Sequence, residues 1–472
     1  MKIEQIYTGC LAQGAYYIES RGEVAIIDPL REVQPYISRA NRNGAKIKYV
    51  LETHFHADFV SGHIDLAKKT GATIVYGPTA KPSFEAYIAR DNEELTLGDV
   101  KIKVLHTPGH TMESVCYLLI DEKGKPVSLF SGDTLFIGDV GRPDLAQKVS
   151  ADLTPEKLAG HLYDSLRNKI LPLPDDIVIY PAHGAGSACG KNMSKETVDT
   201  LGNQKATNYA LRPDLSKEAF IKEVLTGLTE SPAYFPLNVL MNIKGYDSID
   251  QVLQRGKQAL SPDAFEDAAN QTGALILDTR NAEQFKQGFI PNSIFIGIDG
   301  NFAPWVGALI PDIKQQLLLV AEPGREEEVI TRLARVGYDY SIGYLEGGFE
   351  AWKNAGKEID SIDSITPEAL AEMTKENDLQ ILDVRRKSEY DSEHALGAVN
   401  APLDLINDNT GNIGKDETYY VHCEGGYRSV IFNSILRARG YNNLIDVSGG
   451  FKKIKESGKF PLSQYAKPTT ML

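Results

Sequence analysis

The sequence predicts an α/β protein of three domains, and three observations predict it. The chain has 472 residues, too many for one hydrophobic core, and its 42% hydrophobic and 24% charged content is that of a soluble globular protein. Strand-like apolar runs alternate with amphipathic helix-like segments along most of its length. The C-terminal part also carries one such unit twice. Alternation of this kind packs helices against sheets.

Net charge and cysteine content exclude several classes of function. A formal net charge of -14 leaves no general basic face, so we expect neither nucleic acid nor a membrane as a partner. No apolar run reaches the length of a membrane span, and the first residues lack the pattern of a signal peptide, so we expect a cytoplasmic protein. Four cysteines are too few for a disulfide framework, and any that matter should act as thiols.

The first predicted domain covers residues 1–250 and holds seven of the nine histidines. Its predicted strands are KIKYVLET, ATIVYG, VKIKVLHT, SVCYLLI, PVSLFSGD and DDIVIYPAH; HIDLAKKTG and TPEKLAGHLYDSLRNKI are predicted helices. The candidate metal-binding residues follow strands directly, where loops held by a rigid sheet usually carry function. From about residue 190 we expect helices, then an irregular run SPAYFPLNVL, and a boundary near 245–260.

Two copies of one unit follow, over residues 258–358 and 363–465. SPDAFEDAANQTGALILD recurs as TPEALAEMTKENDLQILD, with Asp278 against Asp383 at an offset of 105 residues, and EGGF later recurs as SGGF at an offset of 102. Each copy reads as a helix, a buried strand, a second strand, a helix, a short strand and a last helix. This order predicts two parallel-sheet α/β domains with helices on both sheet faces.

In the second copy, the strand TYYVHC ends on Cys423 and the loop CEGGYRS leads into a predicted helix. A thiol placed there faces loop amides and the positive end of the helix, surroundings that lower thiol pKa values from about 8.5 to below about 7.5. Cys423 is therefore the candidate nucleophile, with Arg428 as a nearby cation. The alternative is a small buried cysteine that only packs.

The pattern of Cys423, Gly426 and Arg428, with ILDVR and SGGF around it, resembles the rhodanese sulfurtransferase family. The resemblance implies that Cys423 carries a persulfide sulfur in a loop whose other members are Glu424, Gly425, Gly426 and Tyr427. It also makes Asp383 and Arg385 a supporting ion pair.

The first copy has lost this chemistry. The offset of 102 residues puts Ala321 at the place of Cys423 and Glu326 at the place of Arg428. We therefore expect residues 258–358 to form a degenerate rhodanese-like domain that is kept for packing or docking.

Metal-binding chemistry is concentrated in ETHFHADFVSGH, residues 52 to 63, and continues in loops after later strands. The candidate ligands are His54, His56, Asp58, His110, Asp133 and His183, with Asp28 nearby. Phe59 stands where such a motif carries another histidine. For His63, His106 and His161 we expect surface or hydrogen-bonding roles and no metal ligation.

This set resembles the metallo-β-lactamase superfamily, which implies an αββα sandwich for residues 1–250. In the dinuclear hydrolases of that superfamily, the first metal takes the positions of His54, His56 and His110. The second takes Asp58, position 59 and His183, with Asp133 bridging. Because the phenyl ring of Phe59 offers no lone pair, we expect one metal ion and not two.

Two histidines and one carboxylate around a single metal leave coordination positions open, which is diagnostic of non-haem Fe(II) oxygenases. The persulfide dioxygenase branch of the superfamily uses such an iron, and its ligand positions correspond to His54, His110 and Asp133. His56, Asp58 and His183 would then support these ligands or add to them. GDTLFIGDVGRPDL is also similar to that branch. Arg142 could bind an anionic persulfide, or it could form a salt bridge with Asp144 or Asp139.

The whole chain resembles bacterial fusions of a persulfide dioxygenase with rhodanese domains. The resemblance implies one Fe(II) per chain, oxidation of a low-molecular-weight persulfide by O2 to sulfite and thiol, and transfer of sulfur from Cys423 to sulfite, giving thiosulfate in sulfide detoxification. The expected partners are the persulfide thiol, O2 and sulfite, and a homo-oligomer is left open. Two alternatives remain: a zinc thioester hydrolase of the glyoxalase II type fused to rhodanese domains, and a non-catalytic sulfur carrier or persulfide sensor.

Cys189 follows His183 by six residues in the glycine-rich loop AHGAGSACGKN, with Lys191 close in sequence. We expect it near the metal cleft, where it would relay persulfide sulfur between the domains. The alternative is an inert loop cysteine. Cys116, within an apolar strand, and Cys10 are expected to pack.

Overall fold

The computed structural model describes residues 1–145, 153–228, 230–376 and 378–467, and it divides into two compact units. One unit comprises Met1–Ile249 with Ala334–Gly337, and the other comprises Asp250–Leu333 with Tyr338–Leu472. Among the described residues, none of the helices is both long enough and apolar enough to cross a bilayer.

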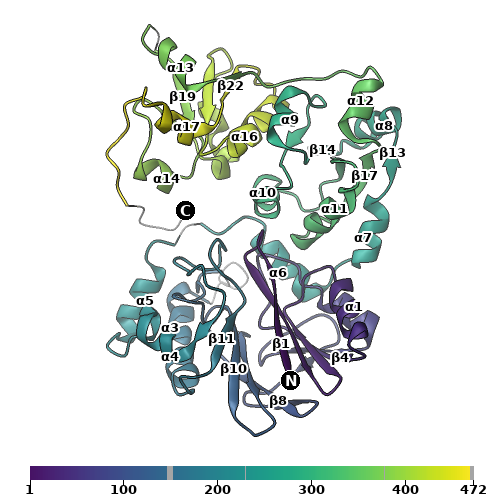
Figure 1. Ribbon diagram of the computed structural model, residues 1–472, viewed down its shortest axis with the longest axis vertical. Coiled ribbons are helices and arrows are strands. Elements are labelled where there is room, and N and C mark those ends of the chain that lie inside the picture. The colour runs from purple at the N-terminus through teal and green to yellow at the C-terminus, as the bar shows by residue number, and fades with distance from the viewer. Residues whose placement is uncertain (146–152, 229, 377, 468–472) are drawn as a thin grey trace. The chain divides into compact units, whose positions relative to one another are not determined.

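The first unit contains two six-stranded sheets (Figure 1). The first sheet has the order β1-β2-β3-β4-β5-β6. Its strands are β1 (Lys2–Thr8), β2 (Gln13–Ser20), β3 (Glu23–Ile27), β4 (Lys46–Leu51), β5 (Thr73–Tyr76) and β6 (Tyr87–Ile88). The second has the order β12-β11-β10-β9-β8-β7. Its strands are β7 (Glu94–Leu97), β8 (Val100–His106), β9 (Val115–Ile120), β10 (Pro126–Gly132), β11 (Val178–Pro181) and β12 (Asp199–Thr200).

Helices cover the outer face of each sheet, and three apolar layers separate the elements. Between the sheets, Tyr16 and Ile27 of the first pack against Val104 and Tyr117 of the second. The helices on the first sheet are α1 (Gln34–Arg42) and α2 (His63–Thr70). Those on the second are α3 (Pro155–Ser165) with the π-helical turn η2 (Leu166–Ile170), α4 (Leu201–Thr207), the 3-10 turn η3 (Tyr209–Leu211) and α5 (Lys217–Leu225). The predicted αββα sandwich is confirmed.

The prediction of an irregular run at SPAYFPLNVL is wrong, because most of it belongs to α6 (Phe235–Lys244). Pro236 lies in the first turn, where a missing N–H leaves no hydrogen bond unmade. Asn242 in the same helix donates from Nδ2 to the carbonyl oxygens of His56 at 2.8 Å and Phe59 at 2.9 Å. The helix therefore fixes the backbone of the predicted metal-binding loop.

The second unit contains two five-stranded parallel sheets, ordered β13-β17-β16-β14-β15 and β18-β22-β21-β19-β20. The first copy has β13 (Ala259–Leu260), β14 (Leu275–Asp278), β15 (Ile294–Phe295), β16 (Leu317–Val320) and β17 (Ser341–Leu345). Its helices are α8 (Pro262–Thr272), α9 (Ala282–Gln287), α10 (Phe302–Leu309), α11 (Glu326–Arg335) and α12 (Gly348–Asn354), and α7 (Ile249–Gly256) precedes them.

The second copy repeats this plan. Its strands are β18 (Ser364–Ile365), β19 (Gln380–Asp383), β20 (Val399–Asn400), β21 (Tyr419–His422) and β22 (Leu444–Val447). Its helices are α13 (Pro367–Met373), α14 (Lys387–Ser392), α15 (Ile406–Asn409), α16 (Tyr427–Ala438) and α17 (Gly450–Ser457), with the 3-10 turns η4 (Leu403–Leu405) and η5 (Thr410–Asn412).

Both copies need a glycine in the GGF turn, because a backbone carbonyl of another loop lies too close for a side chain. Gly348 and Gly450 have φ values of 64° and 60°, which L side chains rarely adopt. A Cβ at Gly450 would lie 2.4 Å from the carbonyl oxygen of Cys423, and one at Gly348 would lie 3.0 Å from that of Ala321. Each turn therefore packs directly against the loop that ends the central strand.

Candidate active sites

Three loops at strand ends bring together His54, His110 and Asp133. They follow β4, β8 and β10, and all three side chains are buried. His110 Nε2 lies 3.4 Å and His54 Nε2 3.9 Å from Asp133 Oδ2. One ligand atom from each residue lies within 4.8 Å of the others, so two imidazoles and one carboxylate converge on one point.

Hydrogen bonds to the opposite ring nitrogens aim both imidazoles at this point. Thr53 Oγ1 donates to Asp28 Oδ2 at 2.8 Å, so it accepts from His54 Nδ1 at 3.0 Å. His110 Nδ1 lies 2.8 Å from the carbonyl oxygen of Arg142, which can only accept. Both histidines therefore carry their protons on Nδ1 and turn the Nε2 lone pairs toward Asp133.

His183 is held between two carboxylates. Its Nδ1 lies 2.8 Å from Asp133 Oδ1, and its Nε2 lies 2.9 Å from Asp58 Oδ2. Burial alone would lower the pKa of His183, but the two carboxylates raise it well above its usual value. His183 is therefore an imidazolium in this arrangement, and its bond to Asp133 Oδ1 orients the other carboxylate oxygen toward His54 and His110.

The donor set fits a metal ion. Among the described residues, Asp133 Oδ2 has no hydrogen-bond partner although it is buried, and such an atom normally has one. Burial would raise the pKa of Asp133, but the charge of His183 and its hydrogen bond hold it below its usual range, so the carboxylate is ionised. An anionic oxygen and two imidazole lone pairs therefore face one another, a donor set that suits a divalent cation.

His56 turns away from this set. Its Nε2 lies 3.1 Å from Asp28 Oδ1 and 3.6 Å from Glu52 Oε2, while its Nδ1 is buried and has no hydrogen-bond partner among the described residues. Burial and the charge of Asp28 raise the pKa of Glu52 well above its usual value. The ring of Phe59 lies 4.3 Å from that of His56. Asp28, Glu52 and His56 form a second group that could hold an ion.

Cys189 lies beside the metal set. Its sulfur, a carboxylate oxygen of Asp58 and a ring nitrogen of His183 are within 4.8 Å of one another. Burial and the charge of Asp58 raise the pKa of Cys189 well above its usual value, so this thiol is protonated. Lys191 is not directed at the thiol, because its Nζ donates to the carbonyl oxygens of Glu223 at 2.6 Å and Thr226 at 3.0 Å.

Of the two roles expected for Arg142, the structure shows the salt bridge with Asp144. Its guanidinium donates to Asp144 from Nε at 2.7 Å and from Nη2 at 2.6 Å. Its backbone joins the two halves of the site, because its N–H donates to the carbonyl oxygen of Cys189 at 2.9 Å and its own carbonyl accepts from His110. A role for its side chain in binding an anionic substrate remains a prediction.

The other histidines and Cys116 lie apart from the three residues of the metal set. The expected surface or hydrogen-bonding role is wrong for His63, which is buried among aromatic rings with neither ring nitrogen hydrogen-bonded among the described residues; burial lowers its pKa to about 3. His106 Nε2 bonds the carbonyl oxygen of Met112 at 2.9 Å, and His161 is exposed on α3. Cys116 packs in the core under the second sheet, where burial raises its pKa to about 11.

Cys423 directly follows β21 and is buried where the loop enters α16. The N–H of Gly426 donates to Cys423 Sγ at 3.1 Å, and Gly426 has a φ of 97° at the start of the helix. Cys423 Sγ also lies 3.6 Å from Ser429 Oγ. The sulfur therefore sits against a loop amide and the N-terminus of a helix, which favours negative charge.

The charged side chains around this loop are paired. Arg428 binds both oxygens of Glu389, at 2.5 and 2.8 Å. Arg385 donates to Asp383 and, at 3.1 Å, to Glu424, which agrees with the expected ion pair. Gly425 is exposed. Tyr427 points away from the thiol, since its hydroxyl donates to the carbonyl oxygen of Gly297 in the first copy at 2.7 Å.

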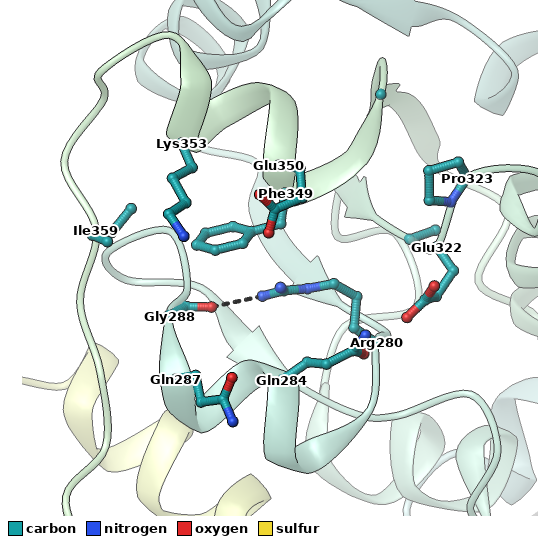
Figure 2. Close-up of a pocket in the computed structure, with 12 residues that line it drawn as sticks. Arg280, Gln284, Gln287, Gly288, Glu322, Pro323, Phe349, Glu350, Lys353 and Ile359 are labelled. Atoms are coloured by element: carbon teal, nitrogen blue, oxygen red, sulfur yellow. Dashed lines mark hydrogen bonds between the residues drawn. The ribbon is translucent and has the colours of Figure 1, made fainter.

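The first copy keeps the fold of this site but not its chemistry. Ala321 follows β16 as Cys423 follows β21, and the N–H of Gly324 donates to Glu326, at 3.1 and 2.9 Å to its two carboxylate oxygens. A cavity of about 250 Å³ remains beside this loop (Figure 2). Figure 2 shows Arg280 donating across it to the carbonyl oxygen of Gly288, at 2.8 Å. The loop amide that holds sulfur in the second copy therefore holds a carboxylate here.

Family models match both units of the chain. The metallo-beta-lactamase superfamily matches residues 8–183, and the rhodanese-like domain matches residues 261–355 and again residues 366–457. A probable hydroxyacylglutathione hydrolase of Schizosaccharomyces pombe is 30% identical over 45% of this chain and 88% of its own length. The chain belongs to the metallo-beta-lactamase superfamily.

Two further relatives agree with this membership. The cytoplasmic hydroxyacylglutathione hydrolase of Arabidopsis thaliana is 32% identical over 39% of this chain and 67% of its own length. A crystal structure of a metallo-beta-lactamase from Staphylococcus aureus is 32% identical, with a TM-score of 0.64, and the match covers 73% of this chain and 98% of that one. Two rhodanese-like domains follow the metallo-beta-lactamase domain here.

Sequence reasoning missed several residues that shape the sites. Thr53 stands inside the metallo-beta-lactamase motif, directly before His54, and Ser429 directly follows Arg428, so both could have been found from their neighbours. Asp446 stands two residues before the SGGF motif and could have been found in the same way, whereas Glu389 stands in a segment without a recognisable motif. No sequence pattern predicts the role of Lys286, because its contact with Asp446 joins residues 160 positions apart.

Proposed function

We propose that the chain is a non-haem iron dioxygenase for low-molecular-weight persulfides joined to a sulfurtransferase that forms thiosulfate. In the first reaction R-S-SH, O2 and H2O give R-SH and sulfurous acid, which ionises to sulfite; sulfur is oxidised and O2 is reduced. In the second, the Cys423 thiolate takes the terminal sulfur of another R-S-SH and displaces R-S⁻, and sulfite then attacks the terminal sulfur of the resulting Cys423 persulfide. The old S–S bond breaks, that of thiosulfate forms, and Cys423 keeps the electron pair as a thiolate.

The convergence of His54, His110 and Asp133 is the observation that carries this proposal. The neighbouring positions favour one metal, because His183 has both nitrogens on carboxylates and Phe59 offers no donor. Iron(II) held by two imidazoles and one carboxylate would keep coordination positions open for substrate and O2 and would allow electrons to pass from the persulfide sulfur to O2. Zinc is the alternative metal.

Neighbouring residues orient His54, His110 and Asp133 and exclude water from them. Thr53 and the carbonyl oxygen of Arg142 fix the two imidazoles, and His183 fixes the carboxylate of Asp133. Burial of these groups excludes water, so each hydrogen bond acts at a low local dielectric. The imidazolium of His183 directs one N–H at Asp133 and the other at Asp58.

The rhodanese-like pair supports the second half of the proposal. Only its second copy, among the described residues, places a thiol against a loop amide at the start of a helix. Sulfite produced by the first domain would meet Cys423 on the same chain at a raised effective concentration. A cytoplasmic location belongs to this proposal, as in the name of the Arabidopsis relative.

A thioester hydrolase is the second candidate. Relatives named hydroxyacylglutathione hydrolase favour it, as does the group of Asp58, His183 and Cys189 beside Asp133, which offers donors for a second ion. A protein that only carries or senses persulfide sulfur is the third.

One experiment separates the three candidates. The protein is purified without O2, its metal is determined, and O2 uptake with glutathione persulfide is compared with hydrolysis of a hydroxyacylglutathione thioester. Iron at one per chain with O2 uptake supports the dioxygenase. Zinc with thioester hydrolysis replaces it by the hydrolase, and neither activity leaves the carrier or sensor.

Replacing Phe59 with histidine is expected to raise the metal content from about one to about two ions per chain, because an imidazole beside Asp58 restores a missing donor. The second ion would displace one of the two protons of His183. Phe59→Leu, which adds no donor, is the matched control and should stay at one. Metal analysis by mass spectrometry checks both, and a Phe59→His protein with one ion contradicts this account of position 59.

Replacing Cys189 with serine tests its proposed relay of sulfur. The position supports a relay, but the thiol is protonated, so the neighbouring Asp58 carboxylate would have to accept its proton. We expect Cys189→Ser to release more sulfite and less thiosulfate per O2 consumed, with Cys10→Ser as the control. Thiosulfate formation equal to that of the unmodified protein would remove Cys189 from the pathway.

A further inference from the structure

A buried lysine of the degenerate domain reaches into the active copy. Lys286 lies in α9, and only 6% of its surface is exposed. Its Nζ donates to Asp446 Oδ2 in β22 at 3.1 Å and lies 2.8 Å from the exposed Glu283. Lysine is almost never buried this far unless it is paired. The buried ion pair therefore connects the two rhodanese-like domains.

Asp446 is in turn connected to the nucleophile. Its second oxygen, Oδ1, accepts from Ser429 Oγ at 2.7 Å, and Ser429 Oγ lies 3.6 Å from Cys423 Sγ. All of these side chains are buried. A continuous path of contacts thus runs from Lys286 through Asp446 and Ser429 to Cys423.

We propose that Lys286 is a positioning residue for Cys423, acting across the domain boundary through Asp446 and Ser429. The proposal rests on the proposed sulfurtransferase function, because it concerns the sulfur that Cys423 would carry. It gives the degenerate domain a part in the chemistry of its neighbour, beyond packing or docking.

The single proton of the Ser429 hydroxyl explains how the lysine acts. In the structure this proton goes to Asp446, and an anionic sulfur on Cys423 would need it as a hydrogen bond. Lys286 offers Asp446 another donor and a positive charge, which weakens the hold of the carboxylate on the hydroxyl. It also offsets a buried negative charge that would otherwise oppose a thiolate or persulfide anion nearby.

The other charged groups around Cys423 are balanced within its own domain. Arg428 is paired with Glu389, and Arg385 with Asp383 and Glu424. Burial lowers the pKa of His422, which favours its neutral form. Burial raises the pKa of Asp446, and the opposing charge comes from Lys286. Asp446 thus differs from the other carboxylates in taking its cation from the first copy.

The degenerate copy has no such path of its own. In the sheet register, Tyr344 pairs with Ala259 as Asp446 pairs with Ser364, so a tyrosine takes the place of the aspartate. The offset of 102 residues puts Glu327 at the place of Ser429. The degenerate domain therefore contributes Lys286 to a path whose other members, Asp446, Ser429 and Cys423, all belong to the active copy.

The test compares variants of the full-length, metal-loaded protein. Lys286→Met removes the charge, Lys286→Arg keeps it, and Asp360→Asn is the control. Asp360 lies in the segment that joins the two domains and binds Arg437 of the second at 2.6 and 2.8 Å, but it does not contact Asp446 or Ser429. The rate at which iodoacetamide alkylates Cys423 is followed against pH by mass spectrometry of the peptide.

We expect Lys286→Met to move the midpoint of this profile about half a pH unit upward and to slow alkylation at pH 7 about threefold. Lys286→Arg and Asp360→Asn should keep the profile of the unmodified protein. An unchanged profile for Lys286→Met, or an equal shift in Asp360→Asn, overturns the proposal. If Lys286→Met does not fold, Lys286→Gln, which keeps a donor without charge, takes its place with the same expected shift.

Alkylation requires no sulfur substrate, so the two proposals can fail separately. A Lys286-dependent profile in a protein that forms no thiosulfate overturns the proposed function and leaves the positioning role. Thiosulfate formation with an alkylation profile that does not depend on Lys286 overturns the positioning role and leaves the proposed function.

Discussion

Asp133→Asn is expected to lose the metal ion and O2 uptake together. The amide keeps an acceptor for His183 but removes the anionic oxygen, Oδ2, on which His54 and His110 converge. Losing groups that only support a ligand already weakens metal binding by about 10 to 100-fold, and losing a charged ligand should exceed that. Iron is expected to fall from about one per chain to below about one tenth.

The control for this variant is Asp164→Asn. Asp164 forms an exposed salt bridge with Lys217 at 2.6 Å, so the same change of carboxylate to amide should leave the iron content unchanged. Both proteins are purified without O2 and compared by metal analysis and by O2 uptake with glutathione persulfide. Full iron occupancy in Asp133→Asn would show that the carboxylate is not a ligand.

Cys423→Ser is expected to stop thiosulfate formation while O2 uptake continues. A serine hydroxyl at this position can still accept from Gly426, but it cannot carry a sulfane sulfur. Removing a catalytic nucleophile costs about a thousandfold or more in rate. Sulfite should therefore accumulate at the rate at which O2 is consumed.

Sulfite and thiosulfate are measured together in this test. Cys116→Ala is the control, because Cys116 packs in the core of the metallo-beta-lactamase domain. Unchanged thiosulfate formation in Cys423→Ser would refute both the nucleophile and the assignment of the second copy as the active one.

Local sequence patterns predicted most of the fold. The strands and helices that carry the sites follow from hydrophobic periodicity, and the internal repeat predicted two copies with one strand order. The helix α6 differs from the irregular run expected at SPAYFPLNVL, because a proline in the first turn of a helix, such as Pro236, is tolerated. Its Asn242 shows that the missed element matters, since it fixes the loop that carries His56 and Phe59.

The candidate metal set was predictable, but its orientation was not. His54, His110 and Asp133 follow strands within a recognisable motif. The acceptors that fix them include Thr53 and a backbone carbonyl of Arg142, and a carbonyl leaves no trace in the residue type. The ion pair of Lys286 with Asp446 depends on how two domains pack, which periodicity within either domain does not encode.

The carboxylate of Glu326 in the degenerate loop makes the loss of its nucleophile hard to reverse. It occupies the amide of Gly324 as a tethered competitor, so an anionic sulfur arriving there would meet a site already filled by its own chain. Ala321→Cys alone would supply a thiol, but the N–H of Gly324 would still be bonded to Glu326 and could not donate to the sulfur. Reversing either change alone, at Ala321 or at Glu326, would therefore not restore the site. The first copy can then serve only to support the second.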